Sequence, residues 1–293
     1  MANNSFGIKA SEEEIINEAI EIVDKAQERN LVLRILGALG IYMCCSSVSK
    51  DYVCTYKGLK RLGDDAMFTD IDFAAYSKQR KEIERLMEGY LKFIPDMAIN
   101  ALFGNRRLIF YNTRKNYSVD IFFDKIEFCH DVAFGNRPGK GRLELCNYHI
   151  PPEDLLLEKL QIHDMNYKDI TDMVMLFLSH RISDVTQFGA INGVYIAKIL
   201  SDDWGFWYDS MNNLKLVEKY VNKFLEEKKL TKEHANIALE NLKNLVNLID
   251  LAPKTRRWNE RAKVGIKKMW YRPVAPLEKR EFQFAAKSNF KIY

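Results

Sequence analysis

The sequence predicts an α+β fold, in which a mixed sheet is followed by helices. Before residue 150, short apolar runs of strand length alternate with segments of helical periodicity. From Pro151-Pro152 onward, apolar residues recur at helical spacing in one segment after another. The 293 residues are enough for two domains that each bury a core. We therefore expect a mixed-sheet domain at 1–150, an α-helical domain at 151–251 and a basic C-terminal segment at 252–293.

The composition is that of a folded protein without a strong overall charge. Apolar residues make up 47% and charged residues 29%, which excludes a disordered chain, and the net charge of +4 says little about partners. Five cysteines form an odd set with no secretory signal ahead of them, so we expect a cytoplasmic protein with reduced thiols. The apolar stretch Leu31–Val48 contains Arg34 and two glycines, so no membrane span is expected.

The first half of the chain contains both helical and strand patterns. Ser11 and Glu14 form a capping box, which predicts an amphipathic helix that ends at Asn30. A strand at Leu31–Leu36, a glycine turn and a short helix follow, and Ser77 caps a later helix to about residue 91. Further strands are expected at Tyr52–Tyr56, Met67–Ala75, Arg107–Asn112, Tyr117–Phe123 and Arg142–Tyr148, with a basic loop up to residue 66 and a turn at Thr113–Asn116.

The second half of the chain has helical periodicity and a basic end. Helices are expected at 153–164, 168–180, 189–201, 212–228 and 231–251, after which Pro253 ends the series. Between Lys254 and Arg272 lie eight basic residues and one acid, Glu260. The apolar side chains of this segment share one helical stripe, which predicts a helix docked by that side. They are Trp258, Ala262, Ile266 and Met269.

Three aspartates interrupt apolar runs that we expect to be strands. Asp70 and Asp72 alternate with apolar residues, so both acids share one strand face, and Asp120 could join them from a neighbouring strand. Gathered carboxylates are costly unless a cation neutralises them, and hard oxygen ligands suit Mg²⁺. We therefore interpret these acids as ligands of two Mg²⁺ ions in a phosphoryl- or nucleotidyl-transfer site, with Asp120 assisting deprotonation of the acceptor.

Two further features have more than one interpretation. The turn Gly37-Ala38 precedes a helix, whose N–H groups and dipole favour a phosphate, but a simple tight turn is an equal alternative. Zinc is a weaker alternative to magnesium, because Cys129-His130 lies near Cys146 and His149 in sequence. No C-x-x-C pair supports a zinc site.

These features resemble the nucleotidyltransferase-fold superfamily of the DNA polymerase beta type. Its pattern is a Gly-Gly or Gly-Ser turn, then Asp-x-Asp, then a third acid, and Gly37-Ala38, Asp70-Ile71-Asp72 and Asp120 follow that order. A closer resemblance is to the prokaryotic branch related to AbiEii-type toxins. Its segment Pro-x-Asp-Leu-Leu-Leu-x-Lys-Leu-Gln reads Pro152 to Gln161 here, and its Asp-x-x-Asp pair reads Asp169 to Asp172. The resemblance covers about residues 31–272.

The resemblance implies an N-terminal nucleotidyltransferase-fold domain and an enzyme that moves a nucleoside monophosphate from a nucleoside triphosphate to an acceptor hydroxyl. It implies that Lys159 contacts the phosphates and that Asp169 and Asp172 shape the pocket. The acceptor is open among RNA (a tRNA end, by analogy), a protein and a small molecule, and an antitoxin-like regulatory protein is a further expected partner. RNA could bind the basic segment 254–272, with Trp270 and Tyr271 stacking on bases, although a solvated basic face is an equal alternative.

The chain departs from the family pattern at Ala38, where the family has Gly or Ser, and in the longer gap from Gly37 to Asp70. These departures favour an alternative function, a catalytically silent module that binds nucleotide or nucleic acid. A metal-dependent nuclease would use the same acids on water, but the Gly37 turn favours a triphosphate. Read alone, Lys159 could be a surface lysine on a leucine-rich helix, and Arg106 and Arg107 could reach phosphate or be solvated.

Overall fold

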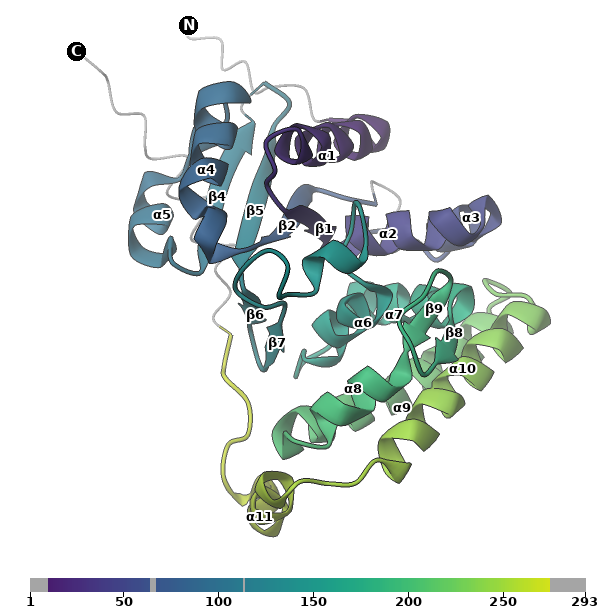
Figure 1. The fold of residues 1–293 in the computed structure, drawn as a ribbon. Coiled ribbons are helices and arrows are strands. Elements are labelled where there is room, and N and C mark those ends of the chain that lie inside the picture. Colours follow the sequence, from purple (N-terminus) through teal and green to yellow (C-terminus); the bar gives the residue numbers. More distant parts are fainter. Residues whose placement is uncertain (1–9, 64–66, 113, 275–293) are drawn as a thin grey trace, which may run out of the picture.

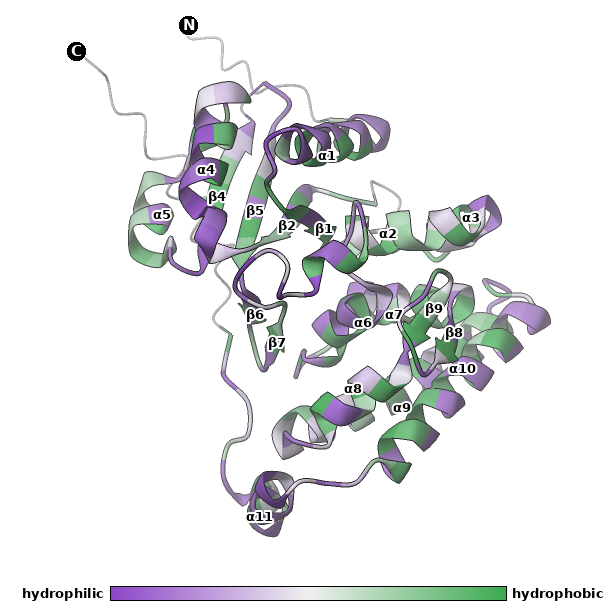
Figure 2. Ribbon diagram, in the orientation of Figure 1, coloured by the Kyte–Doolittle hydropathy of each residue, from purple (hydrophilic) through white to green (hydrophobic). Residues whose placement is uncertain are grey.

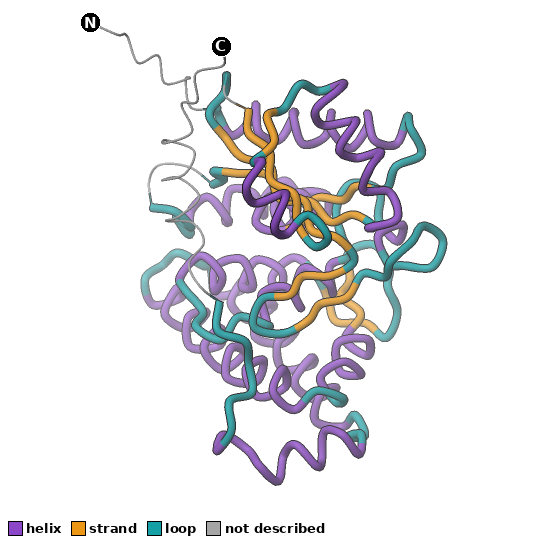
Figure 3. Tube along the Cα trace, turned by 90° about the vertical axis from the view of Figure 1, so that its left-hand side faces the viewer, coloured by secondary structure: helices purple, strands orange, loops and turns teal. Residues whose placement is uncertain are grey.

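The computed structural model describes residues 10–63, 67–112 and 114–274. An N-terminal five-stranded mixed sheet with its helices is followed by a largely helical C-terminal region, so the α+β prediction is confirmed (Figure 1). Viewed from the side, most strands lie in the upper half of the molecule and most helices below them (Figure 3). The expected loop end at 64–66, Thr113 of the expected turn and residues 275–293 of the C-terminal segment lie outside the described residues.

The central sheet has the strand order β1-β2-β5-β4-β3. Strands β2 and β5 run parallel, and the other neighbouring pairs are antiparallel. The strands are β1 (Leu33–Leu36), β2 (Asp70–Ala75), β3 (Ile94–Pro95), β4 (Arg107–Asn112) and β5 (Tyr117–Phe123). In this register Asp72 on β2 lies directly opposite Asp120 on β5. The sheet therefore joins two sequence segments that are far apart in the chain.

The helices of the N-terminal region pack on this sheet or on one another. They are α1 (Glu12–Gln27), α2 (Gly37–Val48), α3 (Lys50–Gly58), α4 (Arg80–Glu84) and α5 (Met97–Phe103), with 3₁₀ turn Ser77–Gln79 before α4 and π-helical turn Arg85–Tyr90 after it. The capping box at Ser11 is confirmed, because its hydroxyl accepts from the Glu14 N–H and the Glu14 carboxylate accepts from the Ser11 N–H.

Two predicted strands are wrong. Residues 52–56 belong to α3, where the Ser49 hydroxyl caps the helix and the Tyr56 ring is fully buried. Residues 142–148 contain the 3₁₀ turn Leu143–Leu145, because the Leu143 N–H donates to the Tyr76 hydroxyl rather than to a strand. In this stretch the Tyr148 carbonyl still accepts from the Ile35 N–H, at the edge of the sheet.

The C-terminal region consists mainly of helices. They are α6 (Pro152–Leu160), α7 (Tyr167–Ser179), α8 (Gly193–Leu200), α9 (Trp204–Glu226), α10 (Lys232–Leu251) and α11 (Arg256–Val264), with a small parallel sheet of β8 (Arg181–Ser183) and β9 (Ala190–Asn192). A small antiparallel sheet of β6 (Lys125–Glu127) and β7 (Asp131–Ala133) precedes α6 in the chain. Helix α9 begins eight residues before the predicted start at 212, because the Asp203 carboxylate caps it. The predicted basic helix ends at Val264, where Gly265 takes a φ of +58°, so Ile266 and Met269 are not on its stripe.

A single buried core connects the two regions. Every residue of α6 is buried, and so is α7 from Asp169 to its end, because both helices lie between the sheet region and helices α9 and α10. Hydrophobic residues follow the strands and the inward faces of the long helices (Figure 2). Among the described helices, none is both long and apolar enough to cross a membrane.

Candidate functional site

The strand register brings the three predicted acids to one face of the sheet. Asp72 lies opposite Asp120, and Asp70, two residues earlier on β2, lies opposite Ser118 on the same face. Asp70 is exposed, Asp72 is partly buried and Asp120 is buried. Neighbouring strands are about 4.8 Å apart, so this pairing places the Asp72 and Asp120 carboxylates side by side.

Burial and mutual repulsion make these carboxylates costly to ionise. Burial raises the pKa of Asp72 well above its usual value, and the negative charges of Asp70, Asp120 and Glu158 raise it further. Burial also raises the pKa of Asp120, although Arg107 opposes that shift. Arg107 lowers the pKa of Asp72 as well. Arg107 alone therefore offsets the cost of ionising Asp72 only in part, and a further cation at this face would favour the ionised form.

Arg107 on β4 holds both carboxylate oxygens of Asp120. Its Nε donates to Oδ1 at 2.9 Å and its Nη2 to Oδ2 at 2.7 Å, which is the bidentate geometry of a strong ion pair. The two side chains share a sheet face, because Ile109, two residues after Arg107, pairs with Asp120. From the sequence, Arg107 could contact phosphate or be solvated. In the structure it pairs with Asp120.

The acids differ in how well they suit magnesium. Mg²⁺ in nucleotide sites is commonly bound by one or two carboxylates together with substrate phosphates, and Asp70 and Asp72 offer such oxygens. Asp120 suits this role less well as arranged, because the positive guanidinium of Arg107 already donates to both of its oxygens. In the described part of the chain, no group of three His, Cys, Asp or Glu side chains is arranged to hold a metal ion. The three-acid metal site stays a prediction.

The Gly37 turn packs directly against Asp72. Gly37 has a φ of +67°, and a Cβ built on it would lie 2.8 Å from Asp72 Oδ2. Glycine is therefore required here both by backbone conformation and by the close approach of the carboxylate. The Gly37 N–H donates to Glu158 Oε2 at 3.0 Å, so a carboxylate takes a position that the sequence assigned to phosphate. The neighbouring Ala38 is partly buried.

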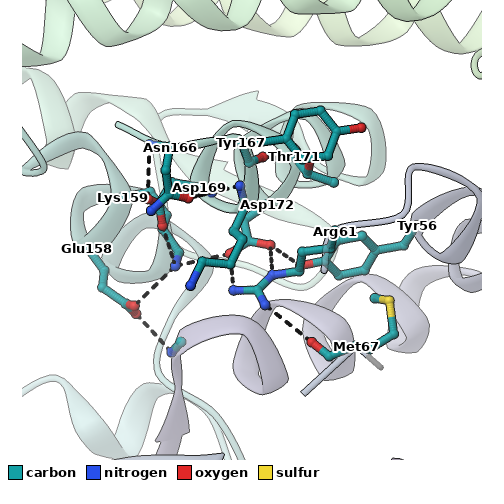
Figure 4. A network of polar contacts seen from close by, with 12 residues as sticks. Tyr56, Arg61, Met67, Glu158, Lys159, Asn166, Tyr167, Asp169, Thr171 and Asp172 are labelled. Carbon is teal, nitrogen blue, oxygen red and sulfur yellow. Dashed lines mark hydrogen bonds and ion pairs between the residues drawn. The ribbon is translucent and has the colours of Figure 1, made fainter. Parts of the chain in front are cut away.

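Lys159 lies in a buried ion network rather than on the surface (Figure 4). Its Nζ is 3.0 Å from Asp172 Oδ2, 3.3 Å from Asp169 Oδ1 and 3.7 Å from Glu158 Oε1. The structure therefore brings together the three residues that the resemblance placed in one pocket, and the surface-lysine alternative is wrong. Its ammonium faces three carboxylates of the chain itself.

Arg61 is the second cation of this network. Its Nε donates to Asp172 Oδ1 at 2.6 Å, its Nη2 donates to Asp172 Oδ2 at 3.2 Å, and its Nη1 donates to the Met67 carbonyl. The Tyr56 hydroxyl also donates to Asp172. The network therefore connects α3, the loop before β2, α6 and α7, and through Glu158 it reaches the Gly37 turn (Figure 4).

The network fixes the charge state of its members. Burial disfavours the charged form of Lys159, but Asp172, Asp169 and Glu158 outweigh it and raise the pKa of the lysine. Burial would likewise raise the pKa of Asp172, yet Lys159 and Arg61 hold it below its usual value. For Glu158, burial is the largest effect and raises the pKa. Lys159 and Asp172 thus stay ionised as a pair.

Sequence reasoning missed Glu158, Arg61 and Tyr56. A usable signal existed for Glu158, because it stands next to Lys159 inside a run of leucines, where charged residues need partners. Arg61 stood in a segment that we expected to be a basic loop, and nothing in its local sequence indicates a partner 111 residues later.

The end of the basic segment packs against the chain itself. The Trp270 Nε1–H donates to Asp209 Oδ1 at 2.8 Å, and the Tyr271 ring stacks on His163 with centroids 3.6 Å apart. Arg272 donates to the Phe128 carbonyl and pairs with Asp131. Both aromatic rings predicted to stack on RNA bases are therefore engaged within the protein. RNA binding by 254–272 stays a prediction.

Comparisons with protein-family models, with curated proteins and with solved structures find no match for this chain. The geometry of the site is therefore the basis for the function proposed for it.

Proposed function

We propose that this chain is a nucleotidyltransferase with the DNA polymerase beta type of fold. It transfers a nucleoside monophosphate from a magnesium-bound nucleoside triphosphate to an acceptor hydroxyl. The supporting observation is the pairing of Asp72 with Asp120 on adjacent parallel strands, with Asp70 on the same face and Gly37 against Asp72. An acidic sheet face beside a glycine turn suits a triphosphate and its cation.

The proposal gives each residue of the site a task. Asp70 and Asp72 would hold Mg²⁺, which supplies charge neutralisation for the triphosphate when it is bound. The Gly37-Ala38 turn would lie beside the phosphates, and Asp120 would accept the proton of the acceptor hydroxyl. Lys159, with Asp169 and Asp172, acts as a positioning group, because its network holds Glu158 near the Gly37 N–H. Nucleotide phosphate could contact Lys159 only in competition with those acids.

Calorimetric titration tests the proposal. Each of the common nucleoside triphosphates is titrated, with and without Mg²⁺, into the wild type, Asp72→Asn and Asp250→Asn, which removes an exposed acid of α10. We expect Mg²⁺-dependent binding of at least one nucleotide by the wild type and by the control. Asp72→Asn should bind this nucleotide at least about tenfold more weakly. No binding of any nucleotide by folded wild type would overturn the proposal.

The acceptor requires a second measurement with the nucleotide that binds. Label from an α-³²P nucleotide is followed into RNA, protein and small molecules. RNA is the first acceptor to test, because Arg256, Lys267 and Lys268 are exposed in the basic segment 254–272. A change in transfer on addition of a co-expressed protein would identify the regulatory partner.

The silent binding module is the second candidate, and two contacts favour it. Arg107 covers the oxygens of Asp120, and Glu158 accepts from the Gly37 N–H, so side chains of the chain itself satisfy both ends of the site. Nucleotide binding without label transfer to any acceptor, and without release of pyrophosphate, would support the module over the enzyme.

A further inference from the structure

Arg107 donates to both carboxylate oxygens of Asp120, so a metal ion at Asp120 would have to share an oxygen with this guanidinium. We propose that Arg107 is an internal counter-ion that competes with a divalent cation for Asp120, so that the third acid joins the metal site only when Arg107 moves away. This inference rests on the proposed function, because it concerns the regulation of the same site.

The geometry shows why the two cations exclude each other. The Arg107 guanidinium approaches Asp120 at 2.7 and 2.9 Å, with one N–H donor on each oxygen. A metal ion bound by Asp120 would need at least one of these oxygens. Two positive ions on one carboxylate would also repel each other, so binding of either one weakens the other.

Charge explains why Arg107 is needed when no metal is bound. The carboxylates of Asp70, Asp120 and Glu158 raise the pKa of Asp72, and the positive charge of Arg107 opposes that effect. Without it, two acids on adjacent strands would face each other uncompensated. An arginine cannot release its proton, so it can leave Asp120 only by turning its side chain away.

The proposed movement would turn the guanidinium of Arg107 toward solvent. The Arg107 side chain is 18% exposed, with its Cζ 5.2 Å from the centre of the Phe122 ring, whereas the Asp120 side chain is 10% exposed. Arg107 is therefore the more solvent-accessible member of the pair.

The test measures Mn²⁺ binding by the loss of the free-ion EPR signal, in the absence of nucleotide. The proteins are the wild type, Arg107→Gln, Arg107→Gln/Asp120→Asn and Arg106→Gln, a matched control because Arg106 is the adjacent arginine, 75% exposed and paired with Glu127. We expect Arg107→Gln to bind Mn²⁺ about tenfold more tightly than the wild type. The double variant should lose this gain, and Arg106→Gln should match the wild type.

Equal or weaker Mn²⁺ binding by Arg107→Gln, or a gain that persists in the double variant, would overturn the inference. If Arg107→Gln fails to fold, Arg107→Lys replaces it, since lysine keeps the charge but not the two-pronged contact, and its affinity should lie above that of the wild type. The proposed function fails separately. If the wild type binds no nucleotide, the proposed function fails, but tighter Mn²⁺ binding by Arg107→Gln would still support the competition at Asp120. If the wild type transfers label and Arg107→Gln binds Mn²⁺ no more tightly, only the competition is overturned.

Discussion

The contacts of Lys159 indicate a contribution to stability, whereas the resemblance implies a contact with phosphate. Its ammonium lies within 3.7 Å of carboxylates from three residues, and the lysine is 6% exposed. Removing one partner of a buried ion pair leaves the other charge uncompensated, which costs more than losing a surface pair. Asp172 would still keep Arg61 and the Tyr56 hydroxyl, which limits the loss.

We expect Lys159→Met to lower the free energy of unfolding by about 3 kcal/mol at pH 7. The apolar replacement keeps the length of the side chain but leaves Asp169 and Asp172 without its charge. Urea unfolding followed by circular dichroism measures the change, with Lys215→Met, an exposed lysine of α9, as the control. A loss below about 1 kcal/mol together with weaker nucleotide binding would assign Lys159 to the phosphates instead.

At the scale of elements, the strap formed by residues 268–272 connects the β6–β7 hairpin to α9. The Arg272 N–H donates to the Cys129 carbonyl, and Trp270 donates to Asp209 on α9. The oxygens of Asp209 also lie 2.8 Å from His130 Nε2 and 3.0 Å from His163 Nδ1, so this carboxylate makes polar contacts with several side chains. The strap is therefore held by specific polar contacts as well as by ring packing.

A pair of tryptophan substitutions isolates the contribution of the Trp270 hydrogen bond. Trp270→Phe and Trp258→Phe remove the same volume, but the Trp258 Nε1–H is buried with no partner among the described residues. We expect Trp270→Phe to destabilise the protein by about 1 kcal/mol more than Trp258→Phe. Urea unfolding followed by circular dichroism gives the difference. Equal losses would show that the Trp270 hydrogen bond to Asp209 adds nothing measurable to the packing of the ring.

Elements whose pattern is local were predictable, and elements decided by distant contacts were not. The bounds of β4 and β5 match the predicted strands, because their apolar and aromatic runs are buried in the sheet whatever surrounds them. Residues 52–56 have a strand-like composition, yet Tyr56 lies in a helix that lets its hydroxyl reach Asp172, 116 residues away. Residues 142–148 follow the same rule, since a hydroxyl 67 residues earlier takes the Leu143 N–H.

At the scale of the whole molecule, the candidate site shows the same contrast between local patterns and distant contacts. The alternation in β2 was enough to place Asp70 and Asp72 on one face, and a neighbouring strand could be expected to add Asp120. The ions that compensate these acids could not be predicted in the same way. Arg107, which compensates Asp120, comes from a third strand. Glu158, which adds a further negative charge, reaches the Gly37 N–H across 121 residues of sequence. The structure is therefore needed to show that charged side chains of the protein itself already contact Asp120 and the Gly37 N–H.

The stability of the whole molecule should depend on pH through His180. This histidine is buried where α2 meets the end of α7, with Cys44 Sγ 3.2 Å from Nε2 and Ser179 Oγ 2.7 Å from Nδ1. Burial lowers its pKa to about 4, and the nearby His149 adds to the effect. Because the folded pKa lies below the ordinary value of about 6.5, the unfolded chain binds this proton more readily, and acidification through that window favours unfolding.

We therefore expect the wild type to lose about 3 kcal/mol more unfolding free energy than His180→Gln between pH 7 and pH 4. Glutamine keeps polar atoms near Cys44 and Ser179 but takes up no proton in this range. Urea unfolding at pH 7, 6, 5 and 4 measures both proteins, and the buried carboxylates titrate in both, so the difference between the two curves isolates residue 180. Parallel curves would show that the loss of stability in acid arises from groups other than His180. Asp72 and Glu158 are excluded as its source, because a carboxyl whose pKa is raised by folding binds its proton more readily in the folded state and so stabilises the fold in acid.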